Sequence, residues 1–133
     1  MKQLNNNIFY LTDFLTNSLG GSGRTILQFN QVIASNNKCF QLVMQTDGNL
    51  VLYKQSTGRA LWSSGTYNVG ASKAVMQGDG NLVVYNSVDQ PKWNSRTNGN
   101  AGAFLILQDD GNLVIYSATA RSLWSSNTVT SCQ

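Results

Sequence analysis

The stretch Gln45-Thr-Asp47-Gly-Asn49-Leu-Val51-Leu-Tyr53 is the first of three copies of one pattern in this chain. The other two copies are Gln77-Gly-Asp79-Gly-Asn81-Leu-Val83-Val-Tyr85 and Gln108-Asp-Asp110-Gly-Asn112-Leu-Val114-Ile-Tyr116. In every copy Gln, Asp, Asn, Val and Tyr occupy every second position, and glycine, apolar or variable residues stand between them. A period of two is typical of a β-strand, whose successive side chains point to opposite faces. Each copy therefore predicts a strand with a polar and an apolar face.

Each copy belongs to a unit of three predicted strands, and the copies repeat every 31 or 32 residues. The first two strands of a unit are separated by Asp-Gly, which favours a tight turn. The third strand carries one tryptophan. The expected strands are 40–45, 49–53 and 60–64 in the first unit, 74–77, 81–85 and 91–95 in the second, and 104–108, 112–116 and 122–126 in the third. No stretch has a helical period of 3.6 residues, so we expect an all-β fold.

The segment before the first unit has less regular patterning. We expect a loop over 18–23, a strand over 25–34 and a turn over 35–38. A length of 133 residues fits one domain, 1–133, with repeats of about 25–64, 65–97 and 98–130.

The apolar face of the repeated strands predicts the core. In the first unit Met44, Leu50 and Leu52 lie on the side opposite Gln45. The equivalent residues and the three tryptophans complete the expected core: Met76, Leu82, Val84, Leu107, Leu113, Ile115, Trp62, Trp93 and Trp124. Each such side chain contributes roughly 1.5–3 kcal/mol when it is fully buried.

Composition excludes several classes of function. Charged residues make up 11% of the chain, and the net charge of +3 comes from scattered lysines and arginines. Nucleic-acid binding usually needs a basic stripe, so we do not expect it. The chain has no histidine, which rules out a Ser-His-Asp triad and a typical zinc site. We expect no metal, no cofactor and no membrane insertion.

The polar face of the motif suits a sugar. Two amides, one carboxylate and one phenol supply donors and acceptors with a single charge. Vicinal hydroxyls both donate and accept, and valine offers an apolar surface to C–H groups. The simpler alternative is that Asp-Gly-Asn is only a turn, but this does not explain why Gln and Tyr recur. Glycoside hydrolysis normally needs two carboxylates, and only Asp109 beside Asp110 provides a neighbouring pair, on opposite faces. We therefore expect binding without catalysis.

The pattern Gln-x-Asp-x-Asn-x-Val-x-Tyr resembles the sugar-binding signature of the bulb-type mannose-binding lectins of monocot plants. All three copies match it without substitution, and the resemblance extends from about Asp13 to about Trp124. It implies a β-prism II fold, in which three four-stranded antiparallel sheets surround a pseudo-threefold axis filled by tryptophans.

The resemblance also implies a metal-independent lectin with three sites for terminal mannose. Asp and Asn would contact the axial O2, Gln would contact O3, Tyr would contact O4, and Val would pack on the ring carbons. The implied partners are high-mannose N-glycans, mannans or bacterial polysaccharide. A second hypothesis is a lectin-like antimicrobial or toxin protein of the bacteriocin type, which uses mannan binding for targeting.

The two cysteines leave several arrangements open. A disulfide between Cys39 and Cys132, within or between chains, and two free thiols all fit the sequence. The usual disulfide of the family cannot form, because Cys39 precedes the first motif and Cys132 is the penultimate residue. Many members of the family exchange their C-terminal strand between subunits, so the resemblance leaves a homodimer open. No signal peptide is visible before Leu15, whereas the resemblance favours an extracellular protein.

Overall fold

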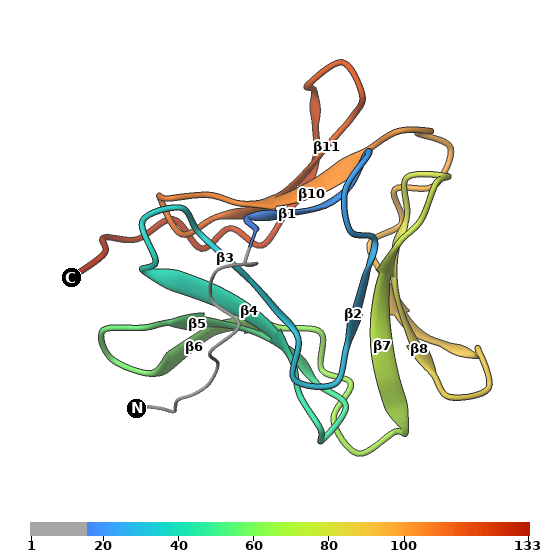
Figure 1. Cartoon of the computed structure of the whole chain (residues 1–133), viewed down its shortest axis with the longest axis horizontal. Helices are drawn as coiled ribbons and strands as arrows, with labels where there is room; N and C mark the ends of the chain where they lie inside the picture. The colour runs from blue at the N-terminus through green and yellow to red at the C-terminus, as the bar shows by residue number, and fades with distance from the viewer. Residues whose placement is uncertain (1–15) are drawn as a thin grey trace.

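The computed structural model describes residues 16–133, and twelve β-strands joined by turns account for all their regular structure. The strands form three antiparallel four-stranded sheets that face a common centre, as Figure 1 shows. No helix that is long and apolar enough to cross a membrane occurs within this part of the chain. The all-β fold class and the three four-stranded sheets are confirmed.

Each sheet contains one of the three motif copies. Sheet 1 has the order β3 (Val32–Ala34), β4 (Phe40–Met44), β5 (Leu50–Lys54) and β6 (Arg59–Ser63). Sheet 2 has the order β2 (Ile26–Gln28), β7 (Ala71–Met76), β8 (Leu82–Asn86) and β9 (Pro91–Asn94). Sheet 3 has the order β1 (Ser18–Gly20), β10 (Phe104–Leu107), β11 (Leu113–Tyr116) and β12 (Ser122–Ser125). The nine strands expected from the repeats are therefore present, with ends that differ by up to three residues.

The segment before the first repeat differs from our expectation. The expected loop over 18–23 begins with strand β1, which pairs with β10. The expected single strand over 25–34 is two strands in different sheets, because a turn interrupts it. In this turn the backbone N–H of Gln31 donates to the carbonyl of Gln28, and Asn30 adopts a φ of 67°. Asparagine tolerates this left-handed conformation better than most residues, and the chain thereby passes from sheet 2 to sheet 1.

The three short N-terminal strands complete the three sheets. They run along the inner side of the prism in Figure 1, where β1 lies beside β10, β2 beside β7 and β3 beside β4. Each provides one fully buried residue, and these residues are Leu19, Leu27 and Ile33. Within the described residues every sheet is therefore completed by its own chain. Asp13, where the resemblance to the lectin family begins, lies outside the described residues.

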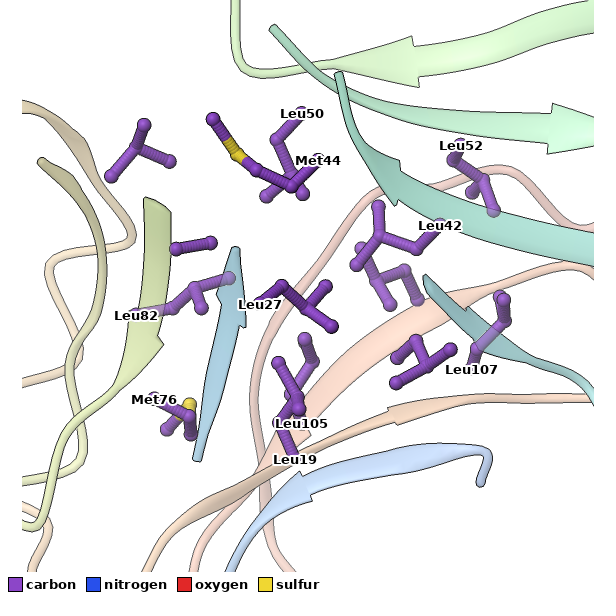
Figure 2. Close-up of a cluster of buried hydrophobic side chains, with 14 of the residues drawn as sticks. Leu19, Leu27, Leu42, Met44, Leu50, Leu52, Met76, Leu82, Leu105 and Leu107 are labelled. Atoms are coloured by element: carbon purple, nitrogen blue, oxygen red, sulfur yellow. The ribbon is translucent and has the colours of Figure 1, made fainter. Parts of the chain in front are cut away.

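The core is built from the predicted apolar faces. Leu and Met side chains from all three sheets converge in one cluster, shown in Figure 2. Every expected Leu, Met, Val and Ile core residue is at most 1% exposed. The three tryptophans pack against this cluster but are only half-buried. Their rings meet edge to face with centroid separations of 5.4–5.8 Å, an arrangement that aromatic pairs prefer.

The C-terminal tail is fastened to sheet 1. Cys132 forms a disulfide with Cys39 of the same chain, and their Cα atoms are 5.4 Å apart. The sequence left an intrachain disulfide, an interchain disulfide and two free thiols open, and the structure has the intrachain disulfide. Residues 126–133 pass the turn of the third motif on the way to this bond, and the backbone N–H of Thr130 donates to the carbonyl of Asp110 at 2.9 Å.

Candidate functional site

A tight turn begins each motif and places its polar residues. In the first motif the backbone N–H of Gly48 donates to the carbonyl of Gln45, and the N–H of Gln45 donates to the carbonyl of Asn49. The three motif glycines, Gly48, Gly80 and Gly111, have φ angles of 90–91°. A Cβ at Gly80 would stand 2.3 Å from the carbonyl oxygen of Asn100. Glycine is therefore required both by the backbone conformation and by the close approach of the following loop.

The motif side chains form a chain of hydrogen bonds across the turn. In the first copy Nε2 of Gln45 donates to both carboxylate oxygens of Asp47, at 3.1 and 3.2 Å. Oε1 of Gln45 accepts from the hydroxyl of Tyr53. Oδ1 of Asp47 also accepts from the backbone N–H of Asn49 at 2.9 Å. These hydrogen bonds fix the orientation of the Gln45 amide, with Nε2 toward Asp47 and Oε1 toward Tyr53. Because the Tyr53 hydroxyl donates to Oε1, its lone pairs remain available to an outside donor.

The asparagine of the motif is oriented by residues outside the motif. Oδ1 of Asn49 accepts from the hydroxyl of Ser64 at 3.3 Å and from the backbone N–H of Thr66 at 3.1 Å. The hydroxyl of Thr66 in turn donates to the carbonyl of Gly48 at 2.7 Å. With Oδ1 occupied, Nδ2 of Asn49 is directed away as a donor, and no described residue accepts from it. The site thus presents a fixed donor beside the carboxylate of Asp47.

The other two copies repeat this arrangement. The asparagine N–H lies 2.9 Å from the aspartate Oδ1 in all three copies. Asn81 is held by Ser95 and Thr97, and Asn112 is held by Ser126 and Thr128. The tyrosine-to-glutamine bond also recurs, with a distance of 2.6 Å between Tyr116 and Gln108. One difference is that Nδ2 of Asn81 also donates to Asn94 at 3.3 Å.

The serine and threonine supports were missed by our sequence analysis. They form the pattern Trp-x-Ser-x-Thr, which occurs as Trp62-Ser-Ser64-Gly-Thr66, Trp93-Asn-Ser95-Arg-Thr97 and Trp124-Ser-Ser126-Asn-Thr128. We used the tryptophans only as core residues. The constant Ser and Thr beyond them were the signal that could have identified the supports.

The fifteen motif residues lie on three separate outer faces of the prism, one set on each sheet. The aspartates are exposed, whereas the glutamines, asparagines and tyrosines are half-buried. The five residues of each copy are thus brought together, and the copies are kept apart. Val51, Val83 and Val114 are outside the core cluster but only 3% exposed, so each offers little apolar surface to a ligand.

The surroundings of the tyrosines distinguish the three copies. The cross-strand neighbours of Tyr53, Tyr85 and Tyr116 on the preceding strand are Gln41, Lys73 and Phe104. Lys73 forms an ion pair with Asp89 at 2.6 Å, and Phe104 packs on Tyr116 with a centroid distance of 6.0 Å. Burial and, to a lesser extent, the charge of Asp47 raise the pKa of Tyr53. This phenol is therefore neutral at pH 7 and keeps the proton that it donates to Gln45.

The second carboxylate of the third motif has a structural partner. Oδ1 of Asp109 accepts from the backbone N–H of Asn37 at 2.9 Å, and the carbonyl of Asp109 accepts from the Asn37 amide at 3.1 Å. Asp109 thereby joins sheet 3 to the β3–β4 turn of sheet 1. Among residues 16–133 no group of three or more His, Cys, Asp or Glu side chains is arranged to hold a metal ion.

Several solved structures with this fold are lectins. The lectin of Gastrodia elata, described as a novel monomeric monocot mannose-binding lectin, is 38% identical, with a TM-score of 0.74 over 86% of this chain and 100% of that chain. The agglutinin of snowdrop (Galanthus nivalis), solved with methyl-α-D-mannoside, is 36% identical, with a TM-score of 0.67 over 86% and 98%. A lectin of Marasmius oreades is 28% identical, with a TM-score of 0.76 over 86% and 93%.

Neither the family sequence models nor the curated proteins give a match to this sequence. The fold, the repeated site and the identity to the Gastrodia and snowdrop proteins over almost their whole length nevertheless define the class. The chain belongs to the bulb-type mannose-binding lectins, the family that the three motif copies indicated.

Proposed function

We propose that this chain binds terminal α-mannosides, without a metal ion, at three sites. The sites comprise Gln45, Asp47, Asn49, Val51 and Tyr53 and their counterparts in the second and third motifs. The observation that carries the proposal is the orientation of the motif asparagine. Because its Oδ1 is occupied by the serine and threonine supports, its Nδ2 stands as a donor next to the aspartate carboxylate.

This pairing of a donor with an acceptor fits one hydroxyl. The axial O2 of mannose accepts from Nδ2 of the asparagine and donates to the aspartate. The adjacent O3 accepts the second hydrogen of the glutamine Nε2, and O4 donates to the tyrosine oxygen. All four groups are then paired. Glucose places O2 equatorially and leaves Asp and Asn unpaired, while galactose moves O4 away from the phenol.

Affinity at one site is expected to be low. A shallow site with a few hydrogen bonds to one sugar has a Kd on the order of millimolar, or about −4 kcal/mol. Three sites on separate faces of one chain raise the avidity for a clustered glycan by roughly 10²–10⁴. High-mannose N-glycans and mannans are therefore the proposed partners. The proposal needs no second chain, because each sheet is complete within one chain over the described residues.

Isothermal titration with methyl α-D-mannoside, methyl α-D-glucoside and methyl α-D-galactoside tests this function. We expect heat of binding with the mannoside alone and the same heat after the protein has been treated with EDTA. Binding of all three sugars with one affinity, or loss of mannoside binding in EDTA, would contradict the proposal. Release of reducing sugar from a mannan would instead show a catalytic activity.

A further inference from the structure

The segment that follows the tryptophan strand differs between sheet 2 and the other two sheets. In each sheet this segment holds the motif turn at two points. A threonine N–H donates to the motif asparagine, and a later N–H donates to the carbonyl of the motif aspartate. The later donor is Asn68 in sheet 1 and Thr130 in sheet 3, each two residues after its threonine. In sheet 2 it is Asn100, three residues after Thr97, so this loop has one extra residue between its attachments.

The two residues between the attachments in sheet 2 are Asn98 and Gly99, the sole Asn-Gly pair of the sequence. Both are exposed. The only hydrogen bond of this pair within residues 16–133 is accepted by the backbone carbonyl of Asn98, from Nδ2 of Asn100 at 3.4 Å. A Cβ built on Gly99 would meet no atom within 4 Å. Neither a hydrogen bond nor a side chain therefore keeps the Gly99 nitrogen from approaching the amide carbon of Asn98.

Comparable pairs elsewhere in the chain are held in place. In the three Asp-Gly pairs of the motifs, the glycine N–H donates to the carbonyl of the motif glutamine at 2.9–3.0 Å. Asn94 precedes Ser95, whose N–H donates to the carbonyl of Leu82 at 2.9 Å. The Asn94 side chain also accepts from the N–H of Arg96 at 2.8 Å. Asn98 differs from these residues because neither its side chain nor the next nitrogen is bonded within the described residues.

We propose that Asn98 is a site of spontaneous deamidation and that its product weakens the second mannose site. The backbone nitrogen of Gly99 gives up its proton, attacks the side-chain carbonyl carbon of Asn98 and displaces ammonia, which closes a cyclic imide. Water then opens this ring at either carbonyl. One opening gives aspartate, and the other gives isoaspartate, in which the main chain runs through the former side chain. The net change converts an amide and water into a carboxylate and ammonium, without an oxidant or a reductant.

The effect on the second site follows from the position of the modified residue, and this step rests on the proposed function. Isoaspartate adds one carbon to the main chain between Thr97 and Asn100. Thr97 orients Asn81 through its N–H at 3.2 Å, and the N–H of Asn100 holds the carbonyl of Asp79 at 3.0 Å. The carbonyl oxygen of Asn100 would stand 2.3 Å from a Cβ on Gly80, so the close packing leaves little room for the change. At least one of the two bonds is then lost, and the second site loses affinity.

The test ages the intact protein and follows the modification by itself. The protein is incubated in neutral buffer, sampled over time and compared with fresh protein by mass spectrometry of its tryptic peptides. Trypsin places Asn94 and Asn98 in separate peptides, 93–96 and 97–121. We expect Asn98 to be converted before Asn94, with isoaspartate as the main product.

Binding is measured on the same samples. Amide NMR titration with methyl α-D-mannoside follows each site through its own motif asparagine. In the converted protein we expect the Kd at the second site, followed at Asn81, to rise about tenfold or more, because a displaced Asp79 loses its charged hydrogen bond to the sugar. The sites followed at Asn49 and Asn112 should keep their affinity, because their supporting segments contain no Asn-Gly pair.

Two variants separate the backbone change from the change of charge. Asn98→Gln keeps an exposed amide on a longer side chain, whose ring closure is far slower. After the same incubation it should be unmodified and should bind at all three sites. Asn98→Asp carries the charge of the product on an unaltered main chain. Freshly prepared, it should also bind at all three sites.

The outcomes separate this inference from the proposed function. If Asn98 is converted no faster than Asn94, the modification site is wrong. If the converted protein keeps its affinity at Asn81, or if fresh Asn98→Asp has already lost it, the link through the lengthened main chain is wrong. The proposed function stands in each of these cases. If the fresh protein does not bind methyl α-D-mannoside, the proposed function is wrong, and the mass spectra still test the modification site.

Discussion

The backbone N–H of Thr66 donates to Oδ1 of Asn49 at 3.1 Å, across two strands of sheet 1. The same bond joins Thr97 to Asn81 and Thr128 to Asn112. It turns the amide of each asparagine so that the nitrogen faces outward. The loop that follows each tryptophan strand therefore sets the donor pattern of the motif, although it contributes no residue to the motif itself.

Ser95 supports both the fold and the second site. Its hydroxyl accepts from the backbone N–H of Leu82 at 3.0 Å and donates to Oδ1 of Asn81 at 3.1 Å, and it is buried. Ser95→Ala leaves both groups with one partner fewer. We expect the free energy of unfolding in urea to fall by about 1–3 kcal/mol and mannoside binding at the second site to weaken. Ser87→Ala, at an exposed position, is the control, and equal stability of the two variants would contradict this role.

Alanine substitutions at Gly80 and Gly99 distinguish the effect of backbone strain from that of a steric clash. Gly80 and Gly99 both have a positive φ, of 91° and 84°, so alanine is strained at either position. Only at Gly80 would a Cβ also collide, 2.3 Å from the carbonyl oxygen of Asn100, whereas no atom lies within 4 Å at Gly99. Gly80→Ala should therefore lower the free energy of unfolding by at least about 1 kcal/mol more than Gly99→Ala. Equal losses would show that the close approach is not maintained in solution.

The disulfide is expected to stabilise the chain and the third site together. The bond between Cys39 and Cys132 closes a loop with a sequence separation of 93 residues. Removing it by the double change Cys39→Ser and Cys132→Ser should cost about 2–5 kcal/mol of unfolding free energy. The tail also carries Thr128, which holds Asn112, and Thr130, whose N–H donates to the carbonyl of Asp110 at 2.9 Å.

The double variant should therefore lose affinity at the third site before the other two. Calorimetry with methyl α-D-mannoside at a temperature where the variant is folded measures this loss. A uniform loss at all three sites would indicate general destabilisation instead.

Alkaline pH should lower both the stability of the fold and sugar binding at the first site through ionisation of Tyr53. Its pKa is raised above the ordinary value of 10.0, chiefly by burial. The unfolded chain therefore loses this proton at a lower pH than the folded chain, and stability falls as the pH rises above 10.0. The phenolate can no longer donate to Gln45, so binding at the first site should also be lost there. Tyr53→Phe is the control, because it should remove this contribution to the alkaline loss of stability; an unchanged pH dependence would contradict the assignment.

The repeats predicted most of the fold, because each has a strict period of two and a turn signal. The core residues from Met44 to Ile115 followed from that alternation. The three N-terminal strands were not predicted correctly, because each is only three residues long and pairs with a distant strand. Nothing local in 25–34 indicated a break except Asn30, whose left-handed conformation depends on the surrounding sheets.

The residue types of the candidate site were predictable from the sequence, whereas their geometry was not. Alternation placed Gln45, Asp47, Asn49 and Tyr53 on one face, and the structure brings them together. The orientation of Asn49 depends on Thr66, which contacts it only after strands β5 and β6 have paired. Phe29, Asp47 and Tyr67 line one cavity although they come from three segments of the chain, so no single stretch of sequence could indicate it.

We expect each of the three sites to bind mannose through the outward Nδ2 of its motif asparagine. The stoichiometry of methyl α-D-mannoside binding tests this when Asn49→Asp, Asn81→Asp and Asn112→Asp are introduced one after another. Each change keeps the oxygen that Ser and Thr hold and should preserve the β-sheet circular dichroism. We predict that the number of binding sites falls by one with each change and reaches zero in the triple variant. A folded triple variant that still binds methyl α-D-mannoside would contradict this role of the asparagines.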